Sequence, residues 1–498
     1  MLRHSTEFRA PGCVSAACTE TPTRSPGPMP NPIAYLMLLV WPVLATVLFR
    51  HLPREKALVW SILGAYMLLP PLASFNLPAV PNMDKFTISN LCALVLAVWL
   101  LGERPRILPE NPIGKALMVL FIAGPFATAL TNPDIIPIFA KDVPALRIYD
   151  SLASVSYQII ALIPFFLARR MLATAEGMKV MVQILVVAGL IYSVPMAIES
   201  RLSPQINIWV YGFFQHDFSQ TMRDGGFRPM VFMPHGLWVA FFALMAAMSA
   251  LLLFRLSPAA ERPRTLVIWL YLMVILVLCR STGPMVYALG LIPVILFAGR
   301  RVQVILAGLM AVVVMTYPLL RGAQLIPLDA ILDMALSYSV DRHQSLEFRI
   351  INEELLLARA MEKPWFGWGG YGRALILDPI TGAIRSIPDG QWIIVLGTYG
   401  WAGYIAEFGL LTLPLFLLMR EAVLGRPADL SPYAALIALI YAANLADLLP
   451  NATLIPFSWL MAGAILGHAE MLARARRQRQ QEAWREELAI RSGPRTVL

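Results

Sequence analysis

The chain has 498 residues, of which 58% are hydrophobic and only 14% are charged. Soluble proteins usually carry about 25% charged residues, so this composition excludes a set of ordinary soluble domains. The net charge is +9. The four cysteines, Cys13, Cys18, Cys92 and Cys279, have neither a pairing pattern nor zinc-ligand spacing, which argues against a disulfide scaffold and a cysteine metal site.

The first 28 residues are polar and rich in Pro, Ser and Thr, and they lack the apolar core of a signal peptide. Met29 begins a run, Met-Pro-Asn-Pro-Ile, that leads directly into the first apolar segment. We interpret residues 1–28 as a leader that is either a disordered tail or a misassigned start, and Met29 is the preferred start.

Apolar runs long enough to cross a bilayer recur along the rest of the chain, since a spanning helix needs about 20 residues. About thirteen runs meet this requirement; they lie near 33–50, 57–73, 86–102, 114–131, 151–168, 179–198, 235–254, 265–280, 282–299, 302–320, 394–419, 432–449 and 454–472. The runs at 265–280 and 282–299 form either two helices joined by a tight turn or one broken helix. The sequence predicts an all-α, polytopic transmembrane bundle of about 12–13 helices over residues 29–472.

Basic residues gather in alternate loops and in a C-terminal tail at residues 473–498. The loop clusters are Arg50/Arg54/Lys56, Arg104/Arg106/Lys115, Arg169/Arg170/Lys179, Arg255/Arg262/Arg264, Arg300/Arg301 and Arg420/Arg426. By the positive-inside rule, these loops and the tail face the cytoplasm. The charge is therefore a topology signal, and we expect the tail to meet anionic lipid in the bilayer and no nucleic acid.

Two long segments, at about 199–234 and 321–393, lie on the opposite, outer side in this topology. Loops as long as the second are usually functional. We expect residues 321–393 to form a helical periplasmic subdomain, beginning with a short helix at 327–340.

An amphipathic helix should follow, with Ser345 as its N-cap and an end near Met361. Its polar face carries Arg349 and Glu353, which are four residues apart and are expected to pair.

The first outer segment places Arg223 and Arg228 on either side of the Gly225-Gly226 turn. Arginine forms paired hydrogen bonds to phosphate and keeps its charge, so this pair can face an anion at the outer mouth of the bundle. The alternative is that both side chains reach toward lipid headgroups.

Residues 367–372, Gly-Trp-Gly-Gly-Tyr-Gly, match a dinucleotide-binding fingerprint only loosely, and no strand precedes them, so that motif is rejected. We expect an irregular turn whose glycines let the backbone approach a ligand. Trp365, Trp368 and Tyr371 would offer aromatic faces to a sugar, or else anchor the segment at the membrane interface.

Three stretches resemble the superfamily of O-antigen ligases and Wzy-type polysaccharide polymerases, which are bacterial membrane glycosyltransferases. They are GFRPMVFMPHG at 226–236, LEFRIINEELLLARAMEKPWFGWGGYG at 346–372 and DGQWIIVLGTYGWAGYIAEFGLL at 389–411. The similarity covers roughly residues 200–420 and elsewhere extends only to the pattern of helices.

The resemblance implies transfer of a glycan from a polyprenyl pyrophosphate carrier on the periplasmic face of the inner membrane, with Arg228, Arg349 and the neighbouring Arg223 binding the pyrophosphate. Ligases of the family typically place a His before the helix that follows the long loop, where this sequence has Asp389. This difference favours a polymerase of exopolysaccharide or O-antigen repeat units in cell-envelope biosynthesis over a ligase that uses a separate acceptor. A chain-length regulator is a possible partner.

Apart from the resemblance, the residue types themselves fit this chemistry. A pyrophosphate leaving group needs its charge stabilised, which arginines supply without a metal or other cofactor. Arg280, at an outer helix end, could join that site. Asp389, with Glu353 second, is the candidate base or orienting acceptor for the glycan acceptor hydroxyl, and a single displacement would invert the anomeric centre.

Two charged residues lie in later apolar runs: we expect Glu407 to bond a neighbouring helix and Asp447 to be solvated near the outer surface. The rival function is a polysaccharide or lipid transporter or flippase. Transporters often have two similar halves with matched broken helices, and no such repeat is seen here. Transfer would be favoured over transport if Arg228 and Arg349 met on the outer side.

Overall fold

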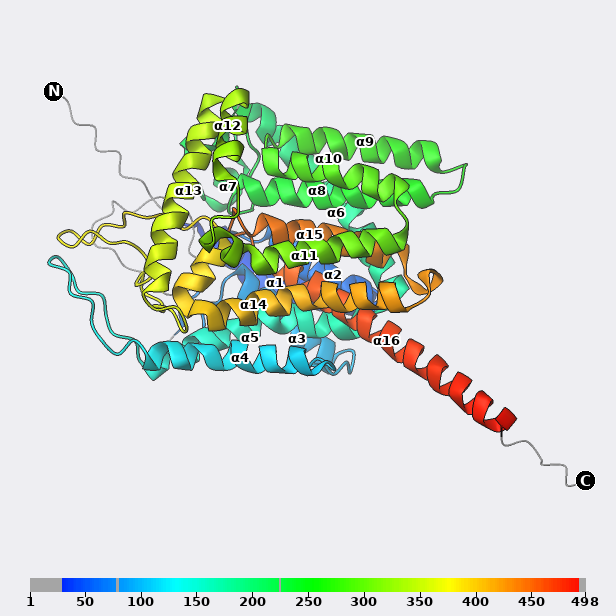
Figure 1. Cartoon of the computed structure of the whole chain (residues 1–498). Coiled ribbons are helices and arrows are strands. Elements are labelled where there is room, and N and C mark those ends of the chain that lie inside the picture. Colours follow the sequence, from blue (N-terminus) through cyan, green and yellow to red (C-terminus); the bar gives the residue numbers. More distant parts are fainter. Residues whose placement is uncertain (1–28, 78–79, 224, 492–498) are drawn as a thin grey trace, which may run out of the picture.

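The computed structural model describes residues 29–77, 80–223 and 225–491, so the expectation for residues 1–28 lies outside the described part. The described chain folds into a bundle of helices with one two-stranded hairpin (Figure 1). The elements are α1 (Pro32–His51), α2 (Arg54–Leu68), α3 (Lys85–Trp99), α4 (Pro112–Leu130), α5 (Ile148–Met171), α6 (Ala175–Leu202), α7 (Ile206–Tyr211), β1 (Met222–Arg223), β2 (Gly226–Phe227), α8 (Gly236–Leu256), α9 (Arg262–Leu278), α10 (Thr282–Phe297), α11 (Arg300–Gly322), α12 (Leu328–Tyr338), α13 (Val340–Met361), α14 (Gln391–Leu424), α15 (Pro432–Asp447) and α16 (Pro456–Arg491).

The bundle has the composition of a membrane protein. Within the described residues, seven helices are long and apolar enough to cross a membrane: α1, α4, α5, α6, α8, α11 and α14. Large apolar side chains also face outward, including Leu39, Val119 and Leu289 at 62%, 63% and 73% exposure. Such apolar surface is stable in the hydrocarbon core of a bilayer, whereas its exposure to water would cost free energy.

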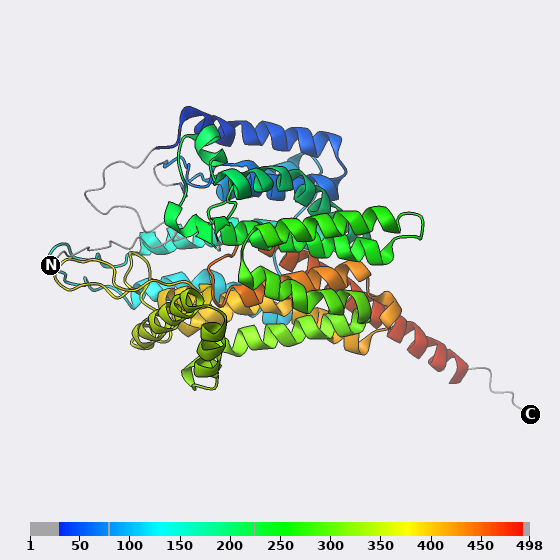
Figure 2. The ribbon, with the colours of Figure 1, turned by 90° about the horizontal axis from the view of Figure 1, so that it is seen from above.

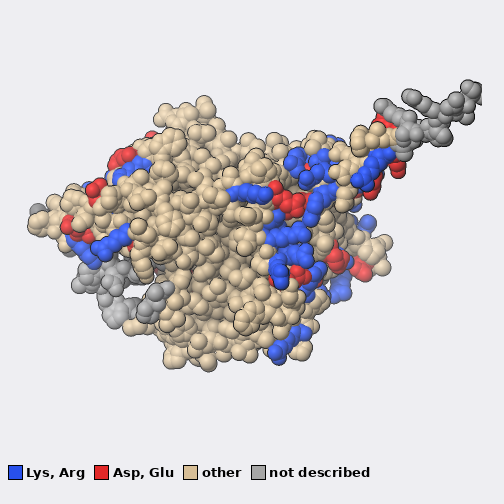
Figure 3. Space-filling model, turned by 90° about the horizontal axis from the view of Figure 1, so that it is seen from below, with Lys and Arg blue, Asp and Glu red and all other residues tan. Residues whose placement is uncertain are grey.

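The basic loops meet at one end of the bundle, here named the basic end (residues 50–56, 103–115, 169–179, 298–301, 420–430 and the second half of α16). Arg54 and Arg170 both pair with Glu103, and Arg476 pairs with Glu421 at 2.8 Å. Figure 3 shows Lys and Arg side chains gathered around this end. Helix α16 continues past residue 472 to Arg491, and its C-terminal part projects away from the other helices in both ribbon views (Figures 1 and 2).

The opposite end, here named the loop end, carries residues 203–235 and 323–390 (Figure 1). The short helix predicted at 327–340 is α12. The expected N-cap of the next helix is wrong, because α13 begins at Val340 and Ser345 lies in its first turns. After α13 the chain forms a turn and an extended loop that bonds the α4–α5 loop, with Phe139 N–H donating to the Pro379 carbonyl at 3.2 Å.

The two adjoining apolar runs form two separate helices, α9 and α10, joined by a tight turn. Arg280 has φ +50° in this turn, in the left-handed region that non-glycine residues rarely adopt. The turn reverses the chain at the loop end, and both α9 and α10 pack against α8 (Figure 1).

Helix α14 bends sharply at Gly400, which has φ +64° and ψ −164°. Gln391 Nε2 donates to Glu407 Oε1 at 2.9 Å, although a straight helix would separate these residues by about 24 Å. Glu407 therefore bonds the first half of its own helix, which corrects the expectation of a neighbouring helix. The backbone groups freed by the bend are satisfied by a nearby turn, as Trp401 N–H donates to the Pro364 carbonyl at 2.7 Å.

Candidate functional site

The loop that carries Arg228 has its backbone fixed by a buried carboxylate. Glu199, near the end of α6, accepts the backbone N–H groups of Met230 at 2.8 Å and Val231 at 2.7 Å. Val231 has φ +51°, an unfavourable conformation that persists only where the surroundings enforce it. The backbone beside Arg228 is therefore held in one conformation.

Lys85 fixes the same loop from the other side. Its buried ammonium donates to the carbonyls of Tyr66 at 2.9 Å and Leu69 at 3.0 Å, at the end of α2, and to the carbonyl of Phe232 at 3.0 Å. A cation suits the carbonyl end of a helix. One side chain thus joins α2, α3 and the Arg228 loop.

Arg228 is 4% exposed, and its Nη2 donates to Ser281 Oγ at 2.6 Å. Its Nε has no hydrogen-bond partner among the described residues. Burial lowers the pKa of Arg228 to about 10, so the guanidinium remains charged at neutral pH. A buried positive charge with an unused N–H can bind an anion.

Helix α13 brings further arginines to this region. Arg342 donates to the Thr282 hydroxyl at the start of α10. Arg349 lies with Nε 3.4 Å from Asp389 Oδ2, and its Nη1 donates to Asn451 Oδ1 at 3.3 Å. Residues from α10, α13, the start of α14 and the α15–α16 loop therefore meet at the loop end.

The predicted pairing of Arg349 with Glu353 is not found. Glu353 is 9% exposed and points instead toward α11 and α14, with Arg321 Nε at 3.9 Å and Trp392 Nε1 donating at 3.3 Å. Arg349 turns to Asp389, which the sequence separates from it by 40 residues.

Both candidate carboxyl groups have raised pKa values. Burial raises the pKa of Asp389, and Arg349 opposes part of that shift. Burial likewise raises the pKa of Glu353, against the hydrogen bond from Trp392 and the charge of Arg321. A carboxylate whose pKa is raised is a stronger base when ionised, which suits general-base catalysis.

Three arginines gather around Arg228. Burial is the largest cause of the lowered pKa of Arg228, and repulsion by Arg223, Arg349 and Arg342 adds to it, so each of these three lies within electrostatic range of Arg228. Arg223 and Arg228 come from the β-hairpin and the following loop, and α13 lies more than 100 residues further along the chain. Like charges repel, so the Asp389 carboxylate beside Arg349 stabilises this group of arginines, and a bound anion can do the same.

Arg280 lies against the hairpin. Its Nη1 donates to the Arg223 carbonyl at 2.9 Å, and a Cβ at Gly226 would overlap its guanidinium. Only glycine leaves room for this contact. Arg280 therefore supports the hairpin that carries Arg223, as well as lying near the arginine cluster.

The predicted sugar-binding aromatic residues lie in different surroundings. Trp365 is 68% exposed, and Tyr371, 40% exposed, donates to Asp150 Oδ1 at 2.6 Å. Trp368 lies under the Arg359 guanidinium, 3.4 Å from the ring centroid, and donates its indole N–H to the Arg359 carbonyl at 2.8 Å. One face of Trp368 is thus occupied by the protein itself.

The expected role of the glycines at 367–372 is wrong for two of them. Space beside Gly367 and Gly369 is filled by the protein: a Cβ on Gly367 would lie 2.5 Å from the Thr398 carbonyl, and one on Gly369 would overlap Leu146. Gly369 N–H donates to the Thr398 carbonyl at 2.8 Å. These glycines let the turn approach the bend of α14, not a ligand.

Asp447 is not solvated, contrary to expectation. It is 3% exposed, and its two carboxylate oxygens accept from Asn451 Nδ2 and Thr453 Oγ1, each at 3.0 Å. Asn451 also accepts from Arg349, so this bonded carboxylate positions one partner of the arginine cluster.

Sequence reasoning missed several residues of this region. His216, Ser281, Asn451 and the buried Arg321 were not singled out. His216 had a detectable signal, since it lies in an outer segment that already held two candidate arginines. Ser281 and Asn451 had none, because isolated polar residues at helix ends are common.

The described residues include no group of three or more His, Cys, Asp and Glu side chains that could hold a metal ion. No protein-family model matches this sequence, and no curated protein is significantly similar to it.

Proposed function

We propose that the chain is a membrane glycosyltransferase that transfers a glycan from a polyprenyl pyrophosphate carrier, as a polymerase of exopolysaccharide or O-antigen repeat units. The observation that carries the proposal is the buried, charged Arg228 with an unpartnered Nε, within electrostatic range of further arginines at one end of an apolar helix bundle. A lipid-linked pyrophosphate supplies both an anion for the unused N–H of Arg228 and the apolar tail that a bilayer accepts.

In this proposal the arginines stabilise the pyrophosphate as its bond to the anomeric carbon breaks. Preorganised charges in a partly dry site are most effective where negative charge develops. Asp389, next to Arg349, accepts the proton of the attacking hydroxyl on the acceptor glycan. The new C–O bond forms as the C–O bond to pyrophosphate breaks, which inverts the anomeric centre.

The same proposal orients the protein in a bacterial inner membrane. The basic end and the C-terminus would face the cytoplasm, following the positive-inside rule. The loop end would then face the periplasm, where lipid-linked repeat units are joined. Helix α13, which carries Arg349, lies at that end (Figure 1).

The test uses the full chain in lipid nanodiscs with polyprenyl pyrophosphate-linked repeat units from the source cell and no other acceptor. Products are separated on a gel. A ladder that disappears in Arg228→Ala and Arg349→Ala supports polymerisation at this site. The matched control is Arg385→Ala, which removes an arginine of the loop end that pairs with Asp378 away from the cluster.

Other outcomes separate the alternatives. A single shifted product that needs a separate acceptor indicates a ligase. No product with either acceptor, together with movement of the lipid-linked substrate across the bilayer, indicates a flippase and contradicts the catalytic role of the arginines.

A further inference from the structure

Glu407 is a buried carboxyl group that the proposed chemistry does not use. It is 8% exposed, lies in the second half of α14, and accepts a hydrogen bond from Gln391 Nε2 at 2.9 Å. Gln391 is the first residue of α14 and follows Asp389 by two positions. The contact therefore connects the buried part of α14 to the segment that carries the candidate base.

The loop between α15 and α16 supports the same segment from its other side. Gln391 N–H is shared between the carbonyls of Leu448 at 2.9 Å and Asn451 at 3.3 Å. A Cβ on Gly390 would lie 2.1 Å from the Leu449 carbonyl oxygen, so only glycine lets the chain pass this close. The backbone of the segment thus rests on one shared N–H, and the Gln391 side chain supplies a second hydrogen bond.

Arg349 binds the same loop independently of α14. Its Nη1 donates to Asn451 Oδ1 and to the Pro450 carbonyl, each at 3.3 Å. Asn451 Nδ2 in turn donates to Asp447, which turns the amide oxygen toward Arg349. Arg349 and Asp389 therefore meet because α13 and the start of α14 both bind this loop, and Arg349 would keep partners of its own if the start of α14 moved.

The bend at Gly400 makes the position of the segment sensitive to small rotations. Gln391 lies nine residues before Gly400, which is about 14 Å of helix. A change of about 4° at the bend would therefore move the start of α14 by about 1 Å. A misplacement of about 1 Å can cost about 100-fold in rate. The hydrogen bond between Gln391 and Glu407 lies away from the bend, where it controls this angle more closely than contacts at the bend itself.

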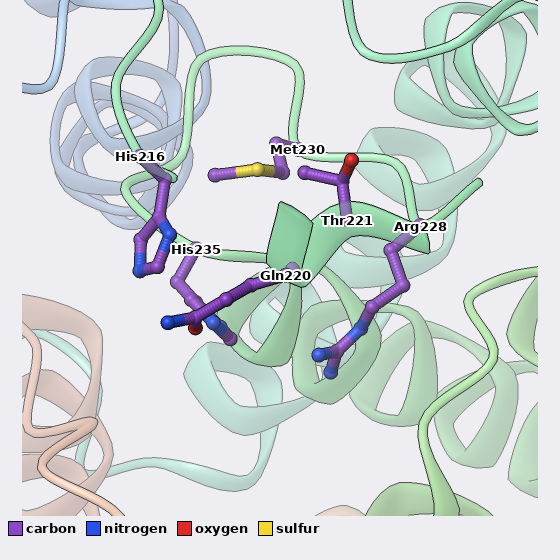
Figure 4. Close-up of a pocket in the computed structure, with 7 residues that line it drawn as sticks. His216, Gln220, Thr221, Arg228, Met230 and His235 are labelled. Atoms are coloured by element: carbon purple, nitrogen blue, oxygen red, sulfur yellow. The ribbon is translucent and has the colours of Figure 1, made fainter. Parts of the chain in front are cut away.

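Arg228 is held by other elements. The residues drawn around Arg228 in Figure 4 all lie between His216 and Gly236, on the segment that leads into the start of α8. Its Nη2 donates to Ser281, just before α10. A change at Glu407 should therefore affect the end of the site that carries Asp389 and leave the Arg228 end in place.

We propose that Glu407 is a positioning residue of the glycosyltransferase: by holding Gln391, it keeps Asp389 beside Arg349. The inference rests on the proposed function for the reaction, whereas the contact itself does not depend on it. Glu407 acts on the rate only through the start of α14. It needs only an acceptor oxygen for this role, which a glutamine also provides.

The kinetic test compares Glu407→Leu with Glu407→Gln in the full chain in nanodiscs, using the lipid-linked repeat units. We expect Glu407→Leu to lower kcat about 10- to 100-fold, because Asp389 is displaced from its working position. KM for the lipid-linked donor should change little, since Arg228 and Arg349 keep their own partners. Glu407→Gln should restore kcat to near the original value.

The matched control is the same pair of substitutions at Glu421. Glu421 is also buried in the second half of α14, but it pairs with Arg476 at the basic end. We expect Glu421→Leu to leave kcat of the folded protein unchanged. An equal fall in kcat for Glu421→Leu and Glu407→Leu would indicate a general loss of structure and overturn the positioning role.

A second measurement does not depend on activity. Amide hydrogen exchange of the peptide at the start of α14 reports how firmly Gln391 is held. We expect about 5-fold faster exchange in Glu407→Leu, as for the loss of one hydrogen bond of ordinary strength. Exchange in Glu407→Gln and Glu421→Leu should match that of the unmodified protein.

The outcomes separate this inference from the proposed function. An unchanged kcat in Glu407→Leu would overturn the positioning role and leave the glycosyltransferase intact, and so would an equal fall in Glu407→Gln and Glu407→Leu. No glycan product from the unmodified protein would contradict the proposed function. In that case, faster exchange in Glu407→Leu would retain Glu407 as the residue that holds the start of α14, and unchanged exchange would reject it.

Discussion

Arg349 and Asp389 form an ion pair, with 3.4 Å between Nε and Oδ2, that joins the middle of α13 to the chain two residues before α14. Both side chains remain partly accessible, at 30% and 21% exposure. A cation for a leaving group and an acceptor for a proton are thus adjacent at the loop end. The pair connects the two halves of the proposed chemistry.

The positive charges of Arg228 and Arg349 should be essential for transfer. The arrangement of the arginine N–H donors should matter as well. We expect Arg228→Ala to lower the transfer rate about 100-fold or more, because a buried donor to the developing anion is lost. Arg349→Lys should recover part of the rate lost in Arg349→Ala, since a lysine retains the charge without the fork of donors. Initial rates of ladder formation measure both effects. Equal rates for Arg228→Ala, Arg349→Ala, Arg349→Lys and the control Arg385→Ala would contradict both predictions.

The pH profile should identify the base. The folded pKa of Asp389 is raised by burial, so the group becomes ionised, and the rate rises, at a pH above the usual range of an aspartate. Arg349 lowers that pKa, so Arg349→Ala should move the acidic limb of the residual activity to higher pH. Rate measurements from acidic to neutral pH test the shift.

The control for this prediction is substitution of the second candidate base, Glu353. The pKa of Glu353 is also raised by burial. If the acidic limb disappears in Glu353→Gln and persists in Asp389→Asn, the base is Glu353 and the assignment to Asp389 is wrong.

Lys85 should be structurally important, because it joins the Arg228 loop to α2 and α3. Lys85→Met leaves three buried carbonyls without their donor, which should lower the free energy of unfolding by about 2–3 kcal/mol. The exposed Lys115 provides the matched substitution, Lys115→Met, with an expected change below about 0.5 kcal/mol. Thermal unfolding in detergent, followed by tryptophan fluorescence, compares them; similar melting temperatures would show that Lys85 does not hold the loop.

The glycines of the turn at residues 367–372 allow a separate test of how this turn packs against the bend of α14. Gly367 and Gly372 have similar φ values, +67° and +72°, but only at Gly367 would an added Cβ lie 2.5 Å from a backbone carbonyl. Gly372→Ala should therefore show only the conformational cost, about 1–2 kcal/mol, and Gly367→Ala a larger loss. Melting temperatures of the two variants measure the difference, and a smaller loss for Gly367→Ala would contradict close packing at the bend.

The bundle was largely predictable because hydropathy and turn residues are local properties of the chain. The boundaries of α12 and the separation of α9 from α10 lay within the alternatives read from the sequence. The start of α13 was misplaced by six residues: Ser345 was expected as the N-cap, whereas the helix begins at Val340 with Ser339 as its N-cap. Capping preference is weaker than the packing of the whole segment.

The candidate site was predictable only as a set of residue types. Two arginines beside a glycine turn indicate an anion site, and Arg223 and Arg228 were chosen on that basis, whereas Arg349 was chosen because its segment resembles that of a known family. Their partners were not predictable, because Ser281 and Asn451 have no distinguishing pattern. The expected Arg349–Glu353 pair failed because helix spacing permits a pair but does not exclude a better partner from another segment.

The sequence by itself determined that this chain forms an apolar helix bundle with its basic residues in alternate loops, since burial of apolar surface depends on composition and period. Only the tertiary structure decided that Glu353 turns inward to Arg321, that the Gly367 turn fills the bend of α14, and that His216 meets His235 beside Arg228. These contacts join segments far apart in the chain. Their distances depend on how helices pack and bend, and no local pattern of residues records that packing.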